Sequence, residues 1–153
     1  MIDLGNGNFR IEGNYPIGIH EVTIRATDAA DNVSTFTFTF EVEDCEAPVA
    51  KCVLGLSIDL MHNGKISIPV EWFNKGSYDE CSGEVKLTYA DPTIYPDSTV
   101  RTFNCSNGEL GLVGVRIWAS DPFGNISFCE TFVNIQNNPQ NGTQFDLCPT
   151  PGA

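Results

Sequence analysis

The chain contains an internal repeat, and this repeat limits the fold more than any other feature of the sequence. Residues 17–34 align with residues 110–127 without a gap, at an offset of 110 − 17 = 93 residues. The identical pairs are Gly18 and Gly111, Val22 and Val115, Ile24 and Ile117, Ala26 and Ala119, Asp28 and Asp121, Asn32 and Asn125, and Ser34 and Ser127. The period suits a β-sandwich module, which occupies about 100 residues.

Each copy of the repeat has the pattern of two strands joined by a tight turn. Apolar and polar side chains alternate through residues 22–27, the period of two that a half-buried strand shows. Residues 28–32 and 121–125 are rich in Asp and Asn and predict hairpin turns. The second strands are expected at residues 34–43 and 127–136, which are dense in the β-formers Thr, Phe and Val.

The second copy is preceded by further strand signals. Short strands are expected at residues 54–60, 65–70, 84–90 and 99–105. The His62-Asn63-Gly64 segment predicts a hairpin turn between the first two of them. The one helical segment expected is a single turn over residues 71–74. The predicted fold class is therefore all-β, as a β-sandwich.

The repeat also predicts that the first unit is incomplete. By the offset, Met1 corresponds to residue 94, midway through the second unit. We therefore expect a partial unit over residues 1–46, a complete unit over residues 47–136 and a tail over residues 137–153. A half-sandwich leaves a sheet edge and an apolar face uncovered. Either a preceding segment or another chain is expected to complete it.

The tail contains a short alternating segment that could act as a donated strand. Thr143, Phe145 and Leu147 would lie on one side of it, with polar residues between them. Strand donation to an open sheet edge is a known mode of association between chains. The alternative is a tail without regular structure.

Charge and cysteine content narrow the functional classes. The chain has 8 basic and 20 acidic residues, a net charge of −12. That balance argues against nucleic-acid binding, which needs a basic face. No apolar run approaches the roughly 18 residues that cross a bilayer. Six cysteines without C-x-x-C spacing indicate disulfides, hence an extracellular setting, whereas no signal peptide precedes them. The chain is expected to be a piece of a larger exported protein.

Several segments resemble the hyalin repeat. In the first unit they are residues 15–22 (YPIGIHEV), 26–32 (ATDAADN) and 44–49 (DCEAPV). The second unit adds residues 76–81 (GSYDEC), 101–105 (RTFNC) and 117–125 (IWASDPFGN), which are similar to repeats of very large secreted surface proteins of Bacteroidetes-type bacteria. The resemblance covers most of residues 9–136 and implies immunoglobulin-like modules in tandem. The chain departs from the pattern at Asp31, where glycine is usual, and at Phe36, where cysteine is usual.

The resemblance, together with the expected strand order, implies a set of disulfides. Cys52 opens the first strand and Cys129 lies in the last, so this pair would tie the two ends of the sandwich together. Cys81 and Cys105 fall on central segments and are expected to pair across it. Cys45 and Cys148 remain, joined either within the chain or to a neighbouring chain.

Calcium is the sharpest site hypothesis. The candidate ligands are Glu43, Asp44 and Glu46 in the linker, Asp79 and Glu80 before Cys81, and Asp121 and Asn125 in the last hairpin turn. In an immunoglobulin-like sandwich these three segments share one end, where their oxygens could hold Ca²⁺ and stiffen the joint between units. The alternative is that they are solvated turn residues, because Asp and Asn favour turns for backbone reasons.

The expected function is structural. The sequence has no Gly-x-Ser-x-Gly elbow, phosphate-binding glycine loop or histidine pair in metal-ligand spacing, so no enzyme is predicted. We expect a repeat or subunit of an extracellular fibre, stalk or adhesin at the cell surface, whose partners are neighbouring copies or modules. The alternative is a carbohydrate-binding module, with Trp72 and Trp118 as ring contacts to surface glycans.

Overall fold

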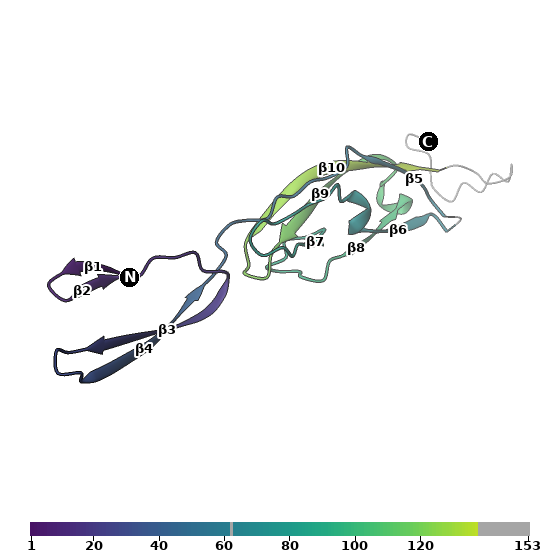
Figure 1. Cartoon of the computed structure of the whole chain (residues 1–153). Coiled ribbons are helices and arrows are strands. Elements are labelled where there is room, and N and C mark those ends of the chain that lie inside the picture. Colours follow the sequence, from purple (N-terminus) through teal and green to yellow (C-terminus); the bar gives the residue numbers. More distant parts are fainter. Residues whose placement is uncertain (62, 138–153) are drawn as a thin grey trace. The chain divides into compact units, whose positions relative to one another are not determined.

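The computed structural model describes residues 1–61 and 63–137. The chain divides into two compact units, Met1–Asp44 and Cys45–Ala153. Both units are built from β-strands, with two short 3-10 turns as the helical segments of the described residues (Figure 1). The predicted all-β sandwich class is confirmed. Within these described segments, no helix is long and apolar enough to cross a membrane.

The first unit consists of two antiparallel hairpins. Strands β1 (Ile2–Gly5) and β2 (Asn8–Arg10) form the short hairpin, and β3 (Gly18–Thr27) and β4 (Val33–Val42) form the long one. The short hairpin was not expected from the sequence. Its signal is the Asn6-Gly7 pair, whose φ angles of 55° and 76° are those of a tight turn between strands.

The second unit contains a four-stranded sheet in the order β5-β10-β9-β7 and a two-stranded sheet, β6–β8. The four-stranded sheet comprises β5 (Leu56–Asp59), β7 (Lys86–Thr88), β9 (Gly111–Ser120) and β10 (Ile126–Gln136). The other sheet comprises β6 (Lys65–Pro69) and β8 (Val100–Asn104), followed by the 3-10 turns η1 (Val70–Phe73) and η2 (Cys105–Asn107), respectively. Apolar side chains from both sheets and from η1 form one buried core, which includes Ile68, Phe73, Phe103, Ile117 and Ile135.

The two long hairpins are the same structure repeated. Strand β3 begins and ends 93 residues before β9, and β4 begins 93 residues before β10. Their registers also agree, because Gly18 pairs with Val42 and Gly111 pairs with Ile135 at the same offset. The sequence repeat is therefore a repeat of strand bounds and register.

Strand β5 has a different partner from the one expected. It runs parallel to β10, with Leu56 opposite Val133, whereas β6 pairs with β8. The turn that contains Asn63 and Gly64 therefore connects two sheets, and the hairpin predicted there is wrong. The backbone N–H of Leu60 donates to a carbonyl of β10, which extends the parallel pairing beyond the end of β5.

The chain before β5 is also attached to β10. A disulfide joins Cys52 to Cys129, the pair implied by the resemblance, with 5.9 Å between the Cα atoms. The Thr131 hydroxyl donates to the Val53 carbonyl at 2.7 Å. The Ser127 hydroxyl donates to the carbonyl of Pro48. The first segment of the unit therefore runs alongside the last strand, which closes the sandwich.

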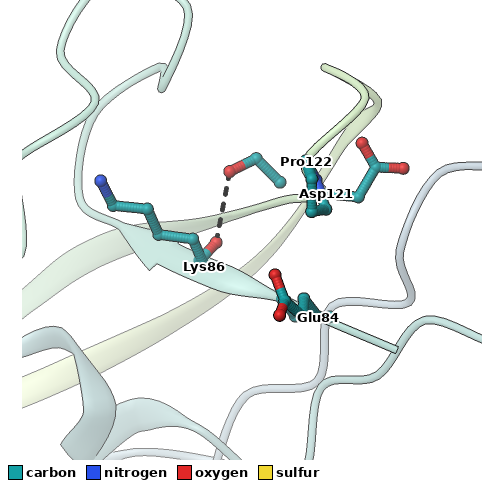
Figure 2. Close-up of a pocket in the computed structure, with 6 residues that line it drawn as sticks. Glu84, Lys86, Asp121 and Pro122 are labelled. Atoms are coloured by element: carbon teal, nitrogen blue, oxygen red, sulfur yellow. Dashed lines mark hydrogen bonds between the residues drawn. The ribbon is translucent and has the colours of Figure 1, made fainter. Parts of the chain in front are cut away.

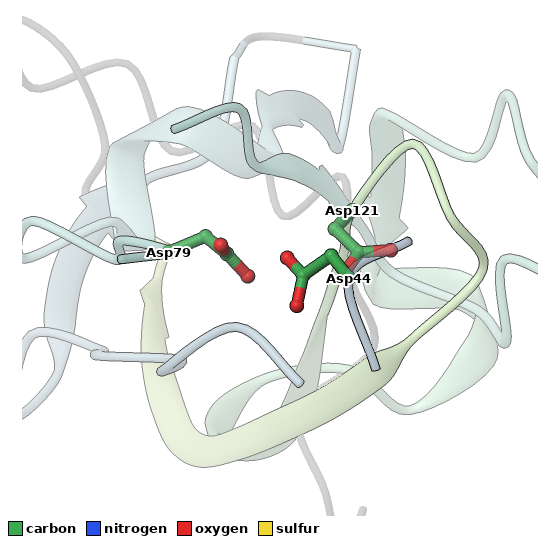
Figure 3. A group of neighbouring side chains, drawn as sticks. All are labelled: Asp44, Asp79 and Asp121. Atoms are coloured by element: carbon green, nitrogen blue, oxygen red, sulfur yellow. The ribbon is translucent and has the colours of Figure 1, made fainter. Parts of the chain in front are cut away.

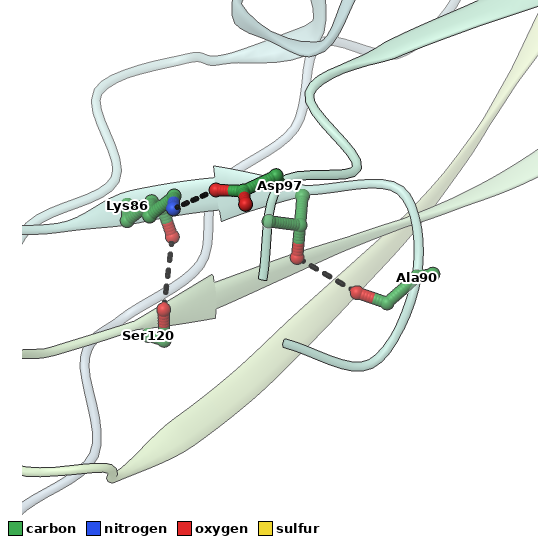
Figure 4. Close-up of polar contacts among 5 residues, drawn as sticks. Lys86, Ala90, Asp97 and Ser120 are labelled. Atoms are coloured by element: carbon green, nitrogen blue, oxygen red, sulfur yellow. Dashed lines mark hydrogen bonds and ion pairs between the residues drawn. The ribbon is translucent and has the colours of Figure 1, made fainter. Parts of the chain in front are cut away.

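Strand β7 is held at the opposite edge of the sheet (Figure 4). The ammonium of Lys86 lies 3.2 Å from a carboxylate oxygen of Asp97, and the Lys86 carbonyl accepts a long hydrogen bond of 3.5 Å from the Ser120 hydroxyl. Thr88 is fully buried, and its hydroxyl donates to the Ala90 carbonyl at 2.7 Å. The buried hydroxyl is thus satisfied where the chain leaves the strand.

Gly55, just before β5, leaves no space for a side chain. Its φ of 149° is rarely adopted by L residues, and a Cβ there would lie 2.5 Å from two ring carbons of Phe132. We predict that Gly55→Ala destabilises the second unit by about 2 kcal/mol, through backbone strain and displacement of the ring. Urea denaturation measures the loss.

Gly114→Ala is the matched control, because nothing lies within 4 Å of its Cβ position and its φ is not positive. It is expected to leave the free energy of unfolding nearly unchanged. Equal effects of the two substitutions would show that the ring of Phe132 does not restrict position 55.

Candidate functional site

The two long hairpins turn through the same hydrogen-bonded loop. In the first, the backbone N–H and the side-chain amide of Asn32 donate to the two carboxylate oxygens of Asp28, both at 2.8 Å. In the second, Asn125 donates to Asp121 in the same way, at 2.9 and 2.7 Å. These bonds, the side-chain amide first, hold the pKa of the Asp28 carboxyl below its ordinary value. The turn therefore presents an oriented carboxylate in both units.

The second unit differs from the first in what surrounds this carboxylate. Single oxygens of Asp44, Asp79 and Asp121 lie within 4.8 Å of one another. Figure 3 shows Asp79 and Asp44 turned toward each other, with Asp121 beside Asp44. Asp44 and Asp121 are only 6% and 8% exposed, and Asp79 is half-buried. We call these three residues the acidic cluster.

Three separate segments supply the acidic cluster. Asp44 is bonded to Cys45, the first residue of the second unit. Asp79 is oriented by a tight turn in which the backbone N–H groups of Cys81 and Ser82 donate to its Oδ1 at 2.9 and 2.7 Å. Asp121 is oriented by the hairpin turn. Three carboxylates this close repel one another where water is largely excluded, so the arrangement favours a bound cation.

The structure brings together only part of the predicted calcium set. Glu43, Glu46 and Glu80 are exposed and lie outside the acidic cluster. Asn125 contributes indirectly, because its amide orients the carboxylate of Asp121. The three aspartates offer only oxygen ligands, which is the donor type that Ca²⁺ takes and that zinc and copper sites seldom use alone.

A depression of about 470 Å³ adjoins Asp121 (Figure 2). Glu84, Lys86, Ser120 and Pro122 are among its lining residues. Figure 2 shows the Lys86 ammonium directed away from Asp121, consistent with its pairing to Asp97. The depression therefore does not place an ammonium group against the Asp121 carboxylate.

The cysteines do not all pair as expected. Cys45 and Cys81 carry exposed thiols, whereas Cys105 is disulfide-bonded. The expected Cys81–Cys105 pair is wrong, because Cys81 lies in the exposed turn after Asp79 and Cys105 is 95% buried at the end of β8. Cys45 is likewise not joined to Cys148 within the chain. Cys148 itself, like the predicted donor residues Thr143, Phe145 and Leu147, lies outside the described residues.

The two tryptophans differ in their suitability as contacts. Trp118 is half-buried on the outer face of β9, where the Phe128 ring lies 5.3 Å away and the Arg116 guanidinium lies 5.8 Å from the indole. Arg116 is in turn held by Glu130 at 2.7 Å. Trp72 in η1 is 53% exposed. Trp72 is thus the more accessible ring, and Trp118 covers the flank of its sheet.

The long hairpin of the first unit leaves only partly covered the face that is core in the second, although the rings of Tyr15 and His20 lie 4.9 and 5.4 Å from that of Phe40. In the second unit Ile117 and Val133 are 1% and 0% exposed. Their counterparts Ile24 and Phe40 are only partly buried, and Phe36, the counterpart of Cys129, is 64% exposed. The inward face of β3–β4 also includes Val22, Phe38 and Val42. We call these six residues the bare face.

The bare face and the acidic cluster are the two features of the described residues that the fold itself does not explain. The bare face is an incomplete core, and the acidic cluster is a concentrated set of oxygen ligands. No protein-family model matches the chain, and no curated protein matches it.

Proposed function

We propose that the chain is a non-enzymatic structural repeat or subunit of an extracellular fibre, stalk or adhesin. The observation that carries this proposal is the bare face. The β3–β4 hairpin repeats the bounds, register and turn of β9–β10, yet within the described residues it lacks the opposing strands that cover β9–β10. A hairpin that is built as half of a sandwich needs the other half.

The energetics support completion by a partner. A two-stranded hairpin is marginally stable by itself in water, and exposed apolar patches mark interaction sites. Covering Phe36 and the rest of the bare face would bury surface that the second unit keeps inside its own core. Each such contact joins one unit to the next, so repetition yields a chain of stacked modules.

The setting proposed for this assembly is extracellular. The Cys52–Cys129 disulfide and the disulfide-bonded Cys105 require oxidising conditions to persist. The resemblance to the hyalin repeat, whose modules occur in tandem in secreted proteins, supports the same setting. The family membership is part of the proposal.

Assembly is tested on the full chain purified under oxidising conditions. Light scattering over a range of concentrations and electron microscopy should show association, and Ile24→Asp on the bare face should abolish it. Thr23→Asp, on the polar face of the same strand, is the control and should leave association intact. A chain that stays monomeric at every concentration would contradict the proposal.

We propose that the acidic cluster binds Ca²⁺. At a calcium concentration 100 times the dissociation constant, binding would stabilise the unit by about 2.7 kcal/mol. We predict that a chelator lowers the melting temperature by about 10 °C. Calorimetry with and without chelator measures the shift.

Asp121→Asn and Asp28→Asn form a matched pair for this prediction. Both change the same turn carboxylate to an amide, but only Asp121 belongs to the acidic cluster. The calcium-dependent shift should disappear in the first variant and persist in the second. Identical melting of the unaltered chain with calcium and with chelator would refute the site.

Carbohydrate binding is the second candidate function. The exposed Trp72 favours it, because indole rings stack on sugars and this ring is accessible. A glycan array with the unaltered chain and Trp72→Ala tests the idea. Binding that survives the substitution, or no binding at all, would eliminate this role for Trp72.

A further inference from the structure

The outer edge of β4 is the counterpart of an edge that is occupied in the second unit. Strand β10 lies between β9 and β5, and the β5 pairing runs from Leu56 opposite Val133 to Asp59 opposite Gln136. Over the part of the chain that the structure describes, β4 pairs with β3 alone. By the 93-residue offset, residues 40–43 form the edge that β5 would occupy.

The occupant of this edge needs a definite pattern of side chains. In the second unit Ile58 is half-buried, Asp59 is exposed and Leu60 is 9% exposed. Leu60 also donates its backbone N–H to the carbonyl of Gln136 at 2.9 Å. An apolar, polar, apolar triplet in extended conformation therefore matches both the hydrogen bonds and the core side of such an edge.

The tail of the chain contains this triplet. Phe145-Asp146-Leu147 has the pattern of Ile58-Asp59-Leu60. The two residues before each triplet are Thr143-Gln144 in the tail and Leu56-Ser57 in β5. We propose that residues 143–147 of one copy add to the outer edge of β4 in another copy, parallel to it. Phe145 then lies beside Val42, and Leu147 covers the end of the bare face.

This inference rests on the proposed function and specifies its contact. The donated segment and the accepting edge are different parts of the chain, so the contact is heterologous. Because each copy can donate once and accept once, repetition gives an open filament unless the rotation closes a ring. The register also places Asp146 beside Glu43, where β10 has Gln136. Two neighbouring acids should weaken the contact at neutral pH.

The register is tested by disulfide trapping between copies. Phe36 is the counterpart of Cys129, and Pro139 precedes Phe145 by the same six residues as Cys52 precedes Ile58. One chain carries Phe36→Cys and the other Pro139→Cys, both with Cys45→Ala and Cys81→Ala, and oxidised glutathione is the oxidant. The mixture should give a covalent dimer that requires both variants. Thr35→Cys, on the opposite face of β4, replaces Phe36→Cys in the control and should give a several-fold weaker dimer.

Light scattering on the same samples separates this inference from the proposed function. Association without preferential trapping would leave the fibre proposal standing and refute the tail as donor. Ile2-Asp3-Leu4 in β1 has the same side-chain pattern as Phe145-Asp146-Leu147. If β1 of another copy were the strand added to β4, the chains would associate without preferential trapping. In a single chain that carries both Phe36→Cys and Pro139→Cys, a link closed within that chain at low concentration would show donation in cis and refute the contact between copies. Absence of association would refute both proposals.

Glu43→Gln provides a test in which the substitution should strengthen the association between copies. It restores the side chain that β10 has at this position and removes the repulsion from Asp146. Association at neutral pH should become several-fold tighter, whereas Glu41→Gln, opposite uncharged Gln144, should have a smaller effect. An unchanged or weaker association of the Glu43→Gln chain would contradict the register.

Discussion

Replacing Cys52 and Cys129 together with alanine is expected to destabilise the second unit by about 4 kcal/mol. The disulfide closes a loop with a sequence separation of 77 residues, and constraining so long a loop removes much entropy from the unfolded chain. The loss is large against the 5–15 kcal/mol that typically separates folded from unfolded domains. Urea denaturation followed by tryptophan fluorescence measures it, since Trp72 and Trp118 both lie in the second unit.

Substitution is preferable to a reductant here, because a reductant would also reduce the disulfide of Cys105. Cys45→Ala is the control, since its thiol is exposed, and it should leave the unfolding curve unchanged. A double alanine variant within about 1 kcal/mol of the unaltered chain would show that the contacts of Val53 and Leu56 along β10 suffice to close the sandwich.

The hairpins could be predicted from sequence because their determinants are local. Alternation of side chains defines the strands, and the Asp28 and Asp121 carboxylates each accept hydrogen bonds from residues two and four positions later in the turn. Such bonds form within one short segment, so a copied motif implies a copied turn. Even Asp31, at φ 63°, adopts the left-handed backbone of its counterpart Gly124 at 87°, which Asp tolerates better than most residues.

The pairing of β5 could not be predicted in the same way. The Asn63-Gly64 turn fits a hairpin, but the choice of partner is made by contacts far away in sequence, such as that of Thr131 with Val53. Trp118 lies on the outer face of β9, but Phe128 on the neighbouring strand and Arg116 on the same strand cover it.

The acidic cluster was predictable in location but not in membership. The sequence predicts that three segments meet at one end of the sandwich: the linker, the segment before Cys81 and the last hairpin turn. Together these segments contain seven candidate ligands. The structure selects Asp44, Asp79 and Asp121 among them. Two of the three are selected by turns that direct their carboxylates, whereas the neighbouring Glu80 remains exposed. Composition cannot distinguish Asp79 from Glu80, or Asp44 from Glu43, since both members of each pair are acids at adjacent positions.

Ile117→Ala and Ile24→Ala make the same change at the same position of the repeat, and we expect very different results. Ile117 is 1% exposed, so its truncation should leave a cavity and cost about 3 kcal/mol in the unfolding followed by tryptophan fluorescence. Ile24 belongs to the bare face, where there is little core to lose in the single chain. Its truncation should leave that unfolding curve unchanged.

The difference between the two positions should shrink when the chain assembles. Once a partner covers the bare face, Ile24 has the surroundings of Ile117, and Ile24→Ala should then raise the concentration at which association begins. Amide hydrogen exchange in β3 and β4, measured below and above that concentration, reports the change directly. Equal losses for the two variants in the dilute chain would mean that β3–β4 already unfolds together with the second unit. The bare face would then be covered within one molecule, and the case for a partner would fail.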